Sequence, residues 1–283
     1  MKQKEPLRLS PDPGAQLAGL RESTEWLREL LTTDELRLYC QPIAALSGSI
    51  RFPMAEVLVR MRAEENAMLP PGDFLPAFEQ CGLMPNLDRW VACDVIRHLA
   101  RGSRIAKFSV NVSAQTLSDV TFPQSVAIEL VSAGVPGTAL LFEVSEEDCI
   151  AHLEPALKFA KAIRAVGCGL IVDGCGLRTK TFTPLKKLRP EFVKIDGAIV
   201  RNLLGASGDQ EKLKALLRVS RAAGFEVIAE MVENQDILIR LKALGVGYVQ
   251  GFGIMQPHPI ELVADERGRL PCGPSTGQAP TVR

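Results

Sequence analysis

Six short apolar runs in this chain each contain or end on one polar side chain that could bind a metal ion or move a proton. These side chains are Asn111, Glu143, Asp173, Lys194, Glu230 and Gln250. A seventh, Glu56, lies in the earlier run MAEVLVRM. Each alone could be a polar group satisfied by a local partner. Six in order along the chain indicate an active site on the ends of parallel strands, where barrel enzymes place their chemistry.

Carboxylates make up much of this set, and burying them together is costly. Three carboxylates near one axis repel one another and lose their hydration, unless a cation compensates for both effects. Ligand sets made only of oxygen favour Mg²⁺, Mn²⁺ or Ca²⁺ over zinc. The row of strand-end side chains therefore predicts a divalent metal site.

The apolar runs that carry these residues alternate with helical patterns. Strands are expected at 36–41, 54–61, 107–112, 139–144, 169–173, 191–195, 225–230 and 247–251. Most are apolar along their whole length, as strands covered on both faces are. Eight such strands predict an α/β fold, a (βα)8 TIM-like barrel.

The gaps between strands predict how the barrel is connected. Helical periodicity is expected over 87–100, 156–167, 210–224 and 237–245, and the last three of these segments end in glycine, a common C-cap. The first two strands are joined by a short polar segment that contains Ser47, Gly48 and Ser49. Such a turn favours an antiparallel pair over a helical crossover, so the first strand is expected to run against the others.

Composition excludes several function classes. The 283 residues carry a formal net charge of +0, so the chain lacks the basic footprint of a protein that binds a nucleic acid polymer. No apolar run approaches the roughly 18 residues of a membrane span, and Met1 is followed by charged residues. The seven cysteines form no CxxC pair, which argues against structural zinc and for reduced thiols. We expect a cytoplasmic protein without membrane contact.

The ends of the chain differ from its centre. Residues 1–14 are polar and rich in proline and predict a flexible leader, and residues 267–283 predict a disordered tail. The barrel domain is expected to occupy residues 15–266.

Several ordered motifs lie between these ends: YCQPI (39–43), EVLVR (56–60), PGDFLPAFEQCGL (71–83), VNVSAQTL (110–117), FEVSE (142–146), KID (194–196), AEMVE (229–233) and QGFG (250–253). With these motifs, the chain resembles the EAL domain of bacterial cyclic di-GMP phosphodiesterases. The resemblance covers about residues 20–262. The fold that it implies is a barrel with an antiparallel first strand, in agreement with the expectation above.

The resemblance implies a role for each strand-end residue. The first metal, Mg²⁺ or Mn²⁺, would be held by Glu56, Asn111, Glu143 and Asp173. Lys194 would position the attacking water, Glu230 would be its general base and Gln250 would support the site. Two metals would stabilise the entering and leaving oxygens while cyclic di-GMP is opened to linear pGpG.

Further residues would bind the dinucleotide or shape its surroundings. Ligand contacts are implied for Gln41, Glu56, Leu58, Arg60 and Asp196, with Arg60 as a fork for a phosphate. Glu146 would brace the loop that follows the strand at 169–173. This loop and the helix after it would form a homodimer interface, and an effector protein is a further implied partner.

One motif departs from the family. Where the family has DDFGTG, this chain has DGCGLR (173–178), so Gly174 replaces the second aspartate, a metal ligand. The departure leaves a single ion, or none, as the expected metal content. Three hypotheses follow: a receptor that binds cyclic di-GMP with weak or lost hydrolysis, which we favour, an active phosphodiesterase, and an interaction module that does not bind the dinucleotide.

Overall fold

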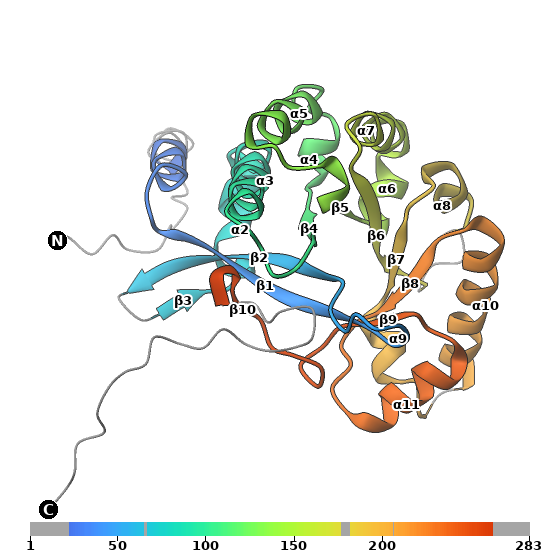
Figure 1. The fold of residues 1–283 in the computed structure, drawn as a ribbon. Helices are drawn as coiled ribbons and strands as arrows, with labels where there is room; N and C mark the ends of the chain where they lie inside the picture. The colour runs from blue at the N-terminus through green and yellow to red at the C-terminus, as the bar shows by residue number, and fades with distance from the viewer. Residues whose placement is uncertain (1–22, 65–66, 177–181, 206, 263–283) are drawn as a thin grey trace, which may run out of the picture.

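The computed structural model describes residues 23–64, 67–176, 182–205 and 207–262, and these form a closed barrel of eight strands with helices around it (Figure 1). The barrel strands are β1 (Leu36–Ala45), β2 (Met54–Glu64), β4 (Lys107–Asn111), β5 (Leu140–Ser145), β6 (Gly169–Cys175), β7 (Phe192–Ile195), β8 (Glu226–Ala229) and β9 (Tyr248–Val249). Each predicted strand is present to within a few residues. The predicted TIM-like barrel is confirmed.

The first strand runs against the others, as predicted. Strand β1 pairs antiparallel with β2, from Leu36 opposite Met61 to Ile43 opposite Met54, and it also pairs antiparallel with β9. The other pairs of neighbouring barrel strands, from β2–β4 to β8–β9, are all parallel. Strand β1 therefore closes the barrel between β9 and β2.

The hairpin of β1 and β2 extends beyond the barrel wall. Strand β2 pairs with β4 only over Met54–Val57, whereas its pairing with β1 continues to Met61. The short strand β3 (Ala67–Leu69) adds to this extension, and β10 (His258–Pro259) pairs with β1. In Figure 1 the blue and cyan ribbons of this hairpin reach past the ring of strands, and by register the residues of β2 after Val57 continue beyond its pairing with β4.

Helices cover the outside of the barrel. The longer ones are α2 (Pro71–Gln80), α3 (Met84–Ala100), α5 (Phe122–Ala133), α7 (Leu153–Ala165), α10 (Ser207–Ala223) and α11 (Gln235–Leu244). The shorter ones are α4 (Ala114–Leu117), α6 (Glu146–Ala151), α8 (Phe182–Leu188), α9 (Gly197–Arg201) and the 3-10 turns η1 (Gly137–Ala139) and η2 (Ile260–Leu262). The four predicted helices correspond to α3, α7, α10 and α11. As expected, α11 ends at a glycine, Gly245, whose φ of 85° is left-handed.

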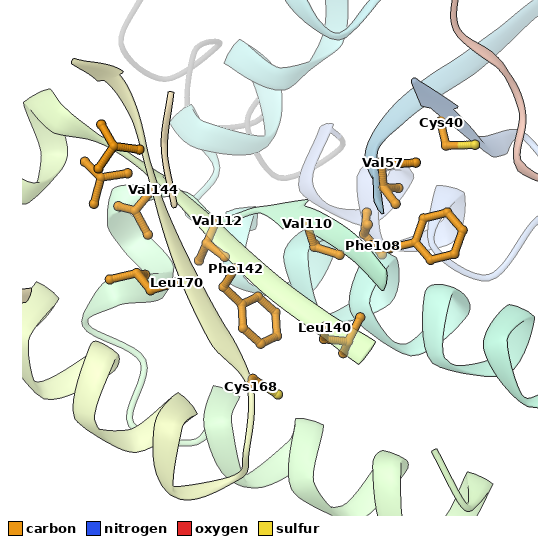
Figure 2. Close-up of a cluster of buried hydrophobic side chains, with 14 of the residues drawn as sticks. Cys40, Val57, Phe108, Val110, Val112, Leu140, Phe142, Val144, Cys168 and Leu170 are labelled. Carbon is orange, nitrogen blue, oxygen red and sulfur yellow. The ribbon is translucent and has the colours of Figure 1, made fainter. Parts of the chain in front are cut away.

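The main core lies between the strands and these helices. Figure 2 shows side chains from β4, β5 and β6, such as Phe108 and Phe142, packed in this layer. Phe142 contacts Phe122 of α5 and Phe159 of α7, with ring centroids 5.5 and 6.0 Å apart. Because successive strand residues point to opposite faces, the residues between these core positions point into the barrel.

The predicted leader (1–14) and tail (267–283) lie outside the described residues. The stretches that are described contain no helix that is both long and apolar enough to cross a bilayer.

Candidate functional site

A layer of apolar side chains fills the lower part of the barrel and sets the position of the site. It consists of Ile43, Met54, Leu141, Ile171, Phe192 and Ile228, with Tyr248 packed against it. A strand residue two positions further on points to the same face. On the strands that run toward the mouth, that position holds Glu56, Glu143, Asp173, Lys194, Glu230 and Gln250. On β1, which runs the other way, it is two positions back and holds Gln41.

The period of the strands thus stacks a polar layer directly on an apolar floor, at the carboxyl ends of the parallel strands. This is the place where barrel folds carry their active sites. The structure brings together the strand-end residues that the sequence predicted, from Glu56 to Gln250, with Gln41 beside them.

Lys194 lies at the centre of the polar layer and is completely buried. Its Nζ is 2.7 Å from Oε2 of Glu56, 2.6 Å from Oε1 of Glu143 and 3.2 Å from Oε1 of Glu230. One ammonium group therefore contacts three carboxylates. These contacts hold all four side chains in one cluster.

Glu56 accepts further hydrogen bonds from both sides. The side-chain amide of Asn111 donates to Oε1 at 2.9 Å, and that of Gln250 donates to Oε2 at 2.7 Å. Gln250 also donates to Oε1 of Gln41, which in turn donates to the backbone oxygen of Met255. With Lys194, three donors from different strands or strand ends therefore orient Glu56, and Gln41 holds one of them, Gln250.

Burial and charge together shift the pKa values of this cluster. Burial raises the pKa of Glu143 well above its usual range, and the negative charges of Glu56, Asp173 and Glu230 raise it further. The ammonium of Lys194 offsets only part of this increase. Burial likewise raises the pKa of Glu230 to about 8, against the pull of Lys194. Both shifts favour the neutral form of the carboxyl group when no cation is bound.

The pKa shifts of Glu56 and Lys194 both favour the charged form of the side chain. Burial alone would raise the pKa of Glu56, but the ammonium of Lys194 and hydrogen bonds from Lys194, Asn111 and Gln250 bring it below its ordinary value. Burial alone would lower the pKa of Lys194, but the carboxylates of Glu143, Glu56 and Glu230 hold it well above its ordinary value. Lys194 is therefore a permanent cation in the barrel.

These residues fit a hard divalent cation. One carboxylate oxygen from each of Glu56, Glu143 and Glu230 lies within 4.8 Å of the other two. The second oxygen of Glu143, Oε2, is buried and has no hydrogen-bond donor in the described part of the chain. A buried carboxylate oxygen without a partner is costly, and oxygen donors in a cluster suit Mg²⁺ or Mn²⁺. The chemistry of the donor set and this orphaned atom both match the metal that the family resemblance implies.

The predicted metal ligands differ in how close their oxygen atoms lie to one another. Glu56 and Glu143 belong to the closest group, and the Asn111 amide contacts Glu56. Asp173 is half-buried and hydrogen-bonded with Glu230, which takes a place in the closest group that sequence reasoning gave to Asp173. The role of each residue toward a metal stays a prediction.

Gly174 follows Asp173 near the end of β6 and has left-handed backbone geometry, with a φ of 72°. Its N–H donates to Oδ1 of Asp173 at 2.6 Å. A Cβ atom at this position would meet no other atom within 4 Å. The position therefore has room for a side chain, but the backbone conformation favours glycine.

The predicted ligand residues of β2 lie above the metal group. Leu58 and Arg60 point to the same face as Glu56, and four residues of strand place Arg60 about 13 Å from Glu56 along the chain. Arg60 is half-buried, donates to the backbone oxygen of Val59 at 2.9 Å, and has its Cζ 5.8 Å from the centre of the Tyr39 ring. Its guanidinium is thus held on the hairpin that extends past the mouth.

Two predicted residues have structural contacts of their own. Asp196 is the N-cap of α9 and accepts a hydrogen bond from the Ala198 N–H at 2.7 Å. Glu146 begins α6, is 4% exposed, and interacts with the buried thiol of Cys175. The loop that it would brace, and the dimer interface predicted there, fall partly in residues 177–181, outside the described residues. The effector protein and the homodimer stay predictions.

Sequence reasoning missed two features near the site. Met231 follows Glu230 with a φ of 52°, although it is not glycine. Asp88 of α3 is 5% exposed and hydrogen-bonds the segment that follows Asn111. A signal for Asp88 existed in the sequence, because it occupies the same helical stripe as Val91, Ala92 and Val95, which is otherwise apolar.

Comparisons with known proteins agree with this geometry. The sequence pattern described as the EAL domain matches residues 24–257. Cyclic di-GMP phosphodiesterase PdeB of Shewanella oneidensis is 29% identical over 261 residues, which cover 90% of this chain and 30% of that protein. The chain spans about a third of the length of the curated relatives it matches.

Solved structures of EAL domains also match this chain. The FimX EAL domain of Xanthomonas citri, in complex with c-diGMP, matches with a TM-score of 0.79 and 26% identity over 87% of this chain and 97% of that one. The FimX EAL domain of Pseudomonas aeruginosa, bound to c-di-GMP, matches with a TM-score of 0.78 and 30% identity over 83% of this chain and 96% of that one.

Proposed function

The chain belongs to the EAL domain family, and from that premise we propose that it binds cyclic di-GMP at the mouth of its barrel and hydrolyses it weakly or not at all. Relatives with this domain are named cyclic di-GMP phosphodiesterases, and two similar domains were solved with the dinucleotide bound. The proposal covers this domain, and the activity of any longer protein that contains it is a further proposal of the same kind.

The observation that supports binding without efficient turnover is the contrast between Gly174 and the carboxylates around it. Glu56, Glu143 and Glu230 offer one group of oxygens for a cation. At the position after Asp173, where the family has a second aspartate, Gly174 offers no side chain at all. A second ion would share Asp173 without a carboxylate of its own, and losing one charge-stabilising group typically costs about 100-fold or more in rate.

The residues of this chain divide the work of binding. Arg60 presents a guanidinium on β2, whose fork geometry suits a phosphate. Lys194 is a permanent cation that holds Glu56, Glu143 and Glu230 together. Mg²⁺ or Mn²⁺, when bound, would neutralise the carboxylates and polarise a phosphodiester. Glu230, whose pKa burial raises to about 8, can accept or release a proton near neutral pH.

Binding of the dinucleotide should depend on a divalent cation. Without a cation, the raised pKa values of Glu143 and Glu230 favour their neutral forms, and Glu56 compensates the ammonium of Lys194. The metal-free cluster therefore offers little positive charge to a ligand with two anionic phosphodiesters. A bound divalent cation would supply that positive charge.

The second candidate is an active phosphodiesterase. The observation that favours it is the close group of Glu56, Glu143 and Glu230 around Lys194, which retains the predicted base and the predicted residue that positions the water. Binding and turnover measured on one preparation separate the two candidates.

We would titrate the protein with cyclic di-GMP by calorimetry in Mn²⁺ and in EDTA, and follow pGpG formation by chromatography. Micromolar binding in Mn²⁺, weaker binding in EDTA and little pGpG are expected. Arg60→Ala should weaken binding at least roughly 10-fold, because a charge-assisted phosphate contact is lost. Arg218→Ala, an exposed arginine on α10, is the matched control and should bind like the parent.

Steady turnover like that of an intact phosphodiesterase assayed beside it would reject the receptor proposal in favour of the enzyme. Absence of binding in both Mn²⁺ and EDTA would reject both candidates and leave an interaction module.

A further inference from the structure

A carboxylate on α3, outside the barrel, holds the segment that follows one of the site residues. Oδ2 of Asp88 accepts three hydrogen bonds: from the Ser113 N–H at 2.9 Å, from the Ser113 hydroxyl at 2.8 Å and from the Thr116 hydroxyl at 2.6 Å. Asp88 is 5% exposed and Thr116 is completely buried. All three donors come from Ser113 and Thr116, within residues 113–116, which form the N-cap and first turn of α4.

This arrangement is unusual for a helix that packs on a barrel. The neighbours of Asp88 on its stripe, Leu87, Val91 and Ala92, are apolar and buried. No ion pair with Asp88 occurs in the described part of the chain, so neutral donors alone compensate its charge. An apolar residue would avoid the desolvation cost of a buried carboxylate. The hydrogen bonds that Asp88 accepts from Ser113 and Thr116 offset part of this cost and fix the start of α4.

The turn held by Asp88 begins two residues after Asn111. Asn111 is the last residue of β4, and its side chain donates to Glu56 at 2.9 Å. On the other side, the Val112 N–H donates to the backbone oxygen of Glu143. Strand β4 ends at Asn111 and α4 begins at Ala114, so the chain passes from strand to helix within two residues, and Ser113 caps α4 while it contacts Asp88.

We infer that Asp88 is a positioning residue, which holds the turn at residues 113–116 so that the Asn111 amide points at Glu56 and the oxygen cluster is ordered for a cation. Asp88 acts through Asn111 and does not contact the ion or the dinucleotide. Groups of this kind, which orient metal ligands from behind, typically change metal affinity by about 10- to 100-fold. The inference about the cation rests on the proposed function, whereas the inference about Asn111 does not.

Two measurements test the inference. The first is Mn²⁺ affinity of the whole chain by electron paramagnetic resonance, without the dinucleotide. The second needs no metal: the side-chain amide signals of Asn111 in the ¹⁵N NMR spectrum, identified by their loss in Asn111→Asp. In Asp88→Ala, Mn²⁺ affinity should fall about 10-fold or more, and the Asn111 amide signals should shift and exchange faster.

Conservative variants separate positioning from general stability. Asp88→Asn keeps an oxygen that can accept the same hydrogen bonds, so it should retain Mn²⁺ affinity to within about 3-fold. Thr116→Val removes one donor of the three at nearly constant shape and should give an intermediate effect. If Asp88→Ala fails to fold, Thr116→Val still tests the inference.

The control is Asp119→Asn. Asp119 ties the far end of the same segment to the same helix through Arg89, at 2.8 Å, without contacting residues 113–116 through its side chain. It should lower stability and leave the Asn111 signals and Mn²⁺ affinity unchanged. Unaltered Asn111 signals in folded Asp88→Ala, or equal effects of Asp119→Asn, would overturn the inference. Shifted signals in a protein that binds no Mn²⁺ would support positioning by Asp88 and reject the proposed metal site instead.

Discussion

Nζ of Lys194 and Oε1 of Glu143 lie 2.6 Å apart in the middle of the barrel, and neither side chain is more than 2% exposed. An ion pair so far from water is stable only when both partners are present, because either charge alone would lack compensation. Lys194 therefore serves as a built-in countercharge for a site whose carboxylates exceed it in number.

The first prediction concerns Lys194→Met, which keeps the length of the side chain and removes its charge. Glu56, Glu143 and Glu230 would then face one another without a cation, and the free energy of unfolding in EDTA should fall by about 3–5 kcal/mol. Mn²⁺ should restore part of this loss. Urea unfolding with and without Mn²⁺ measures both effects.

The matched control for that variant is Lys212→Met, which breaks an exposed ion pair with Asp209. It should cost at most about 1 kcal/mol and show no response to Mn²⁺. A Lys194→Met protein as stable as the parent in EDTA would contradict the role of Lys194 as the countercharge.

The second prediction concerns Gly174→Asp. The new side chain meets no atom within 4 Å of its Cβ, so the cost is confined to the backbone, whose φ is 72°. Aspartate tolerates this region better than most residues, and the free energy of unfolding should fall by only about 1 kcal/mol. Formation of pGpG in Mn²⁺ should rise by roughly 100-fold, because a charge-stabilising group returns.

Gly174→Asn separates charge from shape in that experiment. It has the same size and backbone cost but no carboxylate, so its pGpG formation should stay at the level of the parent. Equal rates in the two variants would show that the missing carboxylate does not limit hydrolysis, and the altered segment at residues 177–182 would become the next target.

Much of this site could be predicted because each site residue lies on or directly after a strand that its run of apolar residues identifies. The apolar floor residues Leu141, Ile171 and Phe192 each precede a site residue by two positions, so strand period alone puts Glu143, Asp173 and Lys194 in one layer. The antiparallel direction of β1 followed from the short polar turn at Ser47–Ser49, which no helix could fill.

Other features depend on contacts between distant segments, which no local pattern records. The pairing of Asp88 with Ser113 joins residues 25 positions apart, so the helical stripe can mark Asp88 as buried but cannot identify its partner. Helix α5 was not predicted from periodicity either. It is apolar on most sides, with Ile128 and Val131 exposed, so it has no clear amphipathic stripe.

The third prediction concerns the backbone at Met231, which adopts a φ of 52° beside Glu230. Left-handed geometry penalises any residue with a Cβ, so Met231→Gly should be more stable than Met231→Ala by about 1 kcal/mol. The comparison of glycine with alanine isolates this strain, because both variants lose the contacts of Met231 with Gly197 and Arg201. Urea unfolding measures the difference.

Two other positions calibrate the Met231 result. Arg189 has a φ of 51° and should show the same order of stability, glycine above alanine. Lys214 lies within α10, where alanine should be the more stable by about 1 kcal/mol. Alanine above glycine at position 231 would show that the backbone there relaxes out of the left-handed region.

The fourth prediction is a pH dependence that arises from Asp88. Burial raises the pKa of Asp88 from 3.8 to about 6, against hydrogen bonds from Thr116 and Ser113 that lower it. Because the folded protein holds this proton more tightly than the unfolded chain, the contribution to stability is complete below pH 4 and is lost as the pH rises through 6. A shift of about two units corresponds to about 3 kcal/mol. Asp88→Asn cannot titrate, so its stability relative to the parent should rise by about that amount between pH 4 and 7.

Urea unfolding of parent and variant at each pH measures this difference, and Asp119→Asn gives the comparison. Burial alone would raise the pKa of Asp119, but hydrogen bonds from Thr121 and the nearby Arg89 bring it below its ordinary value. The stability that Asp119 contributes is therefore present above its unfolded pKa and is lost only at more acidic pH, so Asp119→Asn should show no trend between pH 5 and 7. A constant difference between the parent and Asp88→Asn from pH 4 to 7 would mean that the Asp88 carboxyl keeps an ordinary pKa, with Ser113 and Thr116 fully compensating its burial.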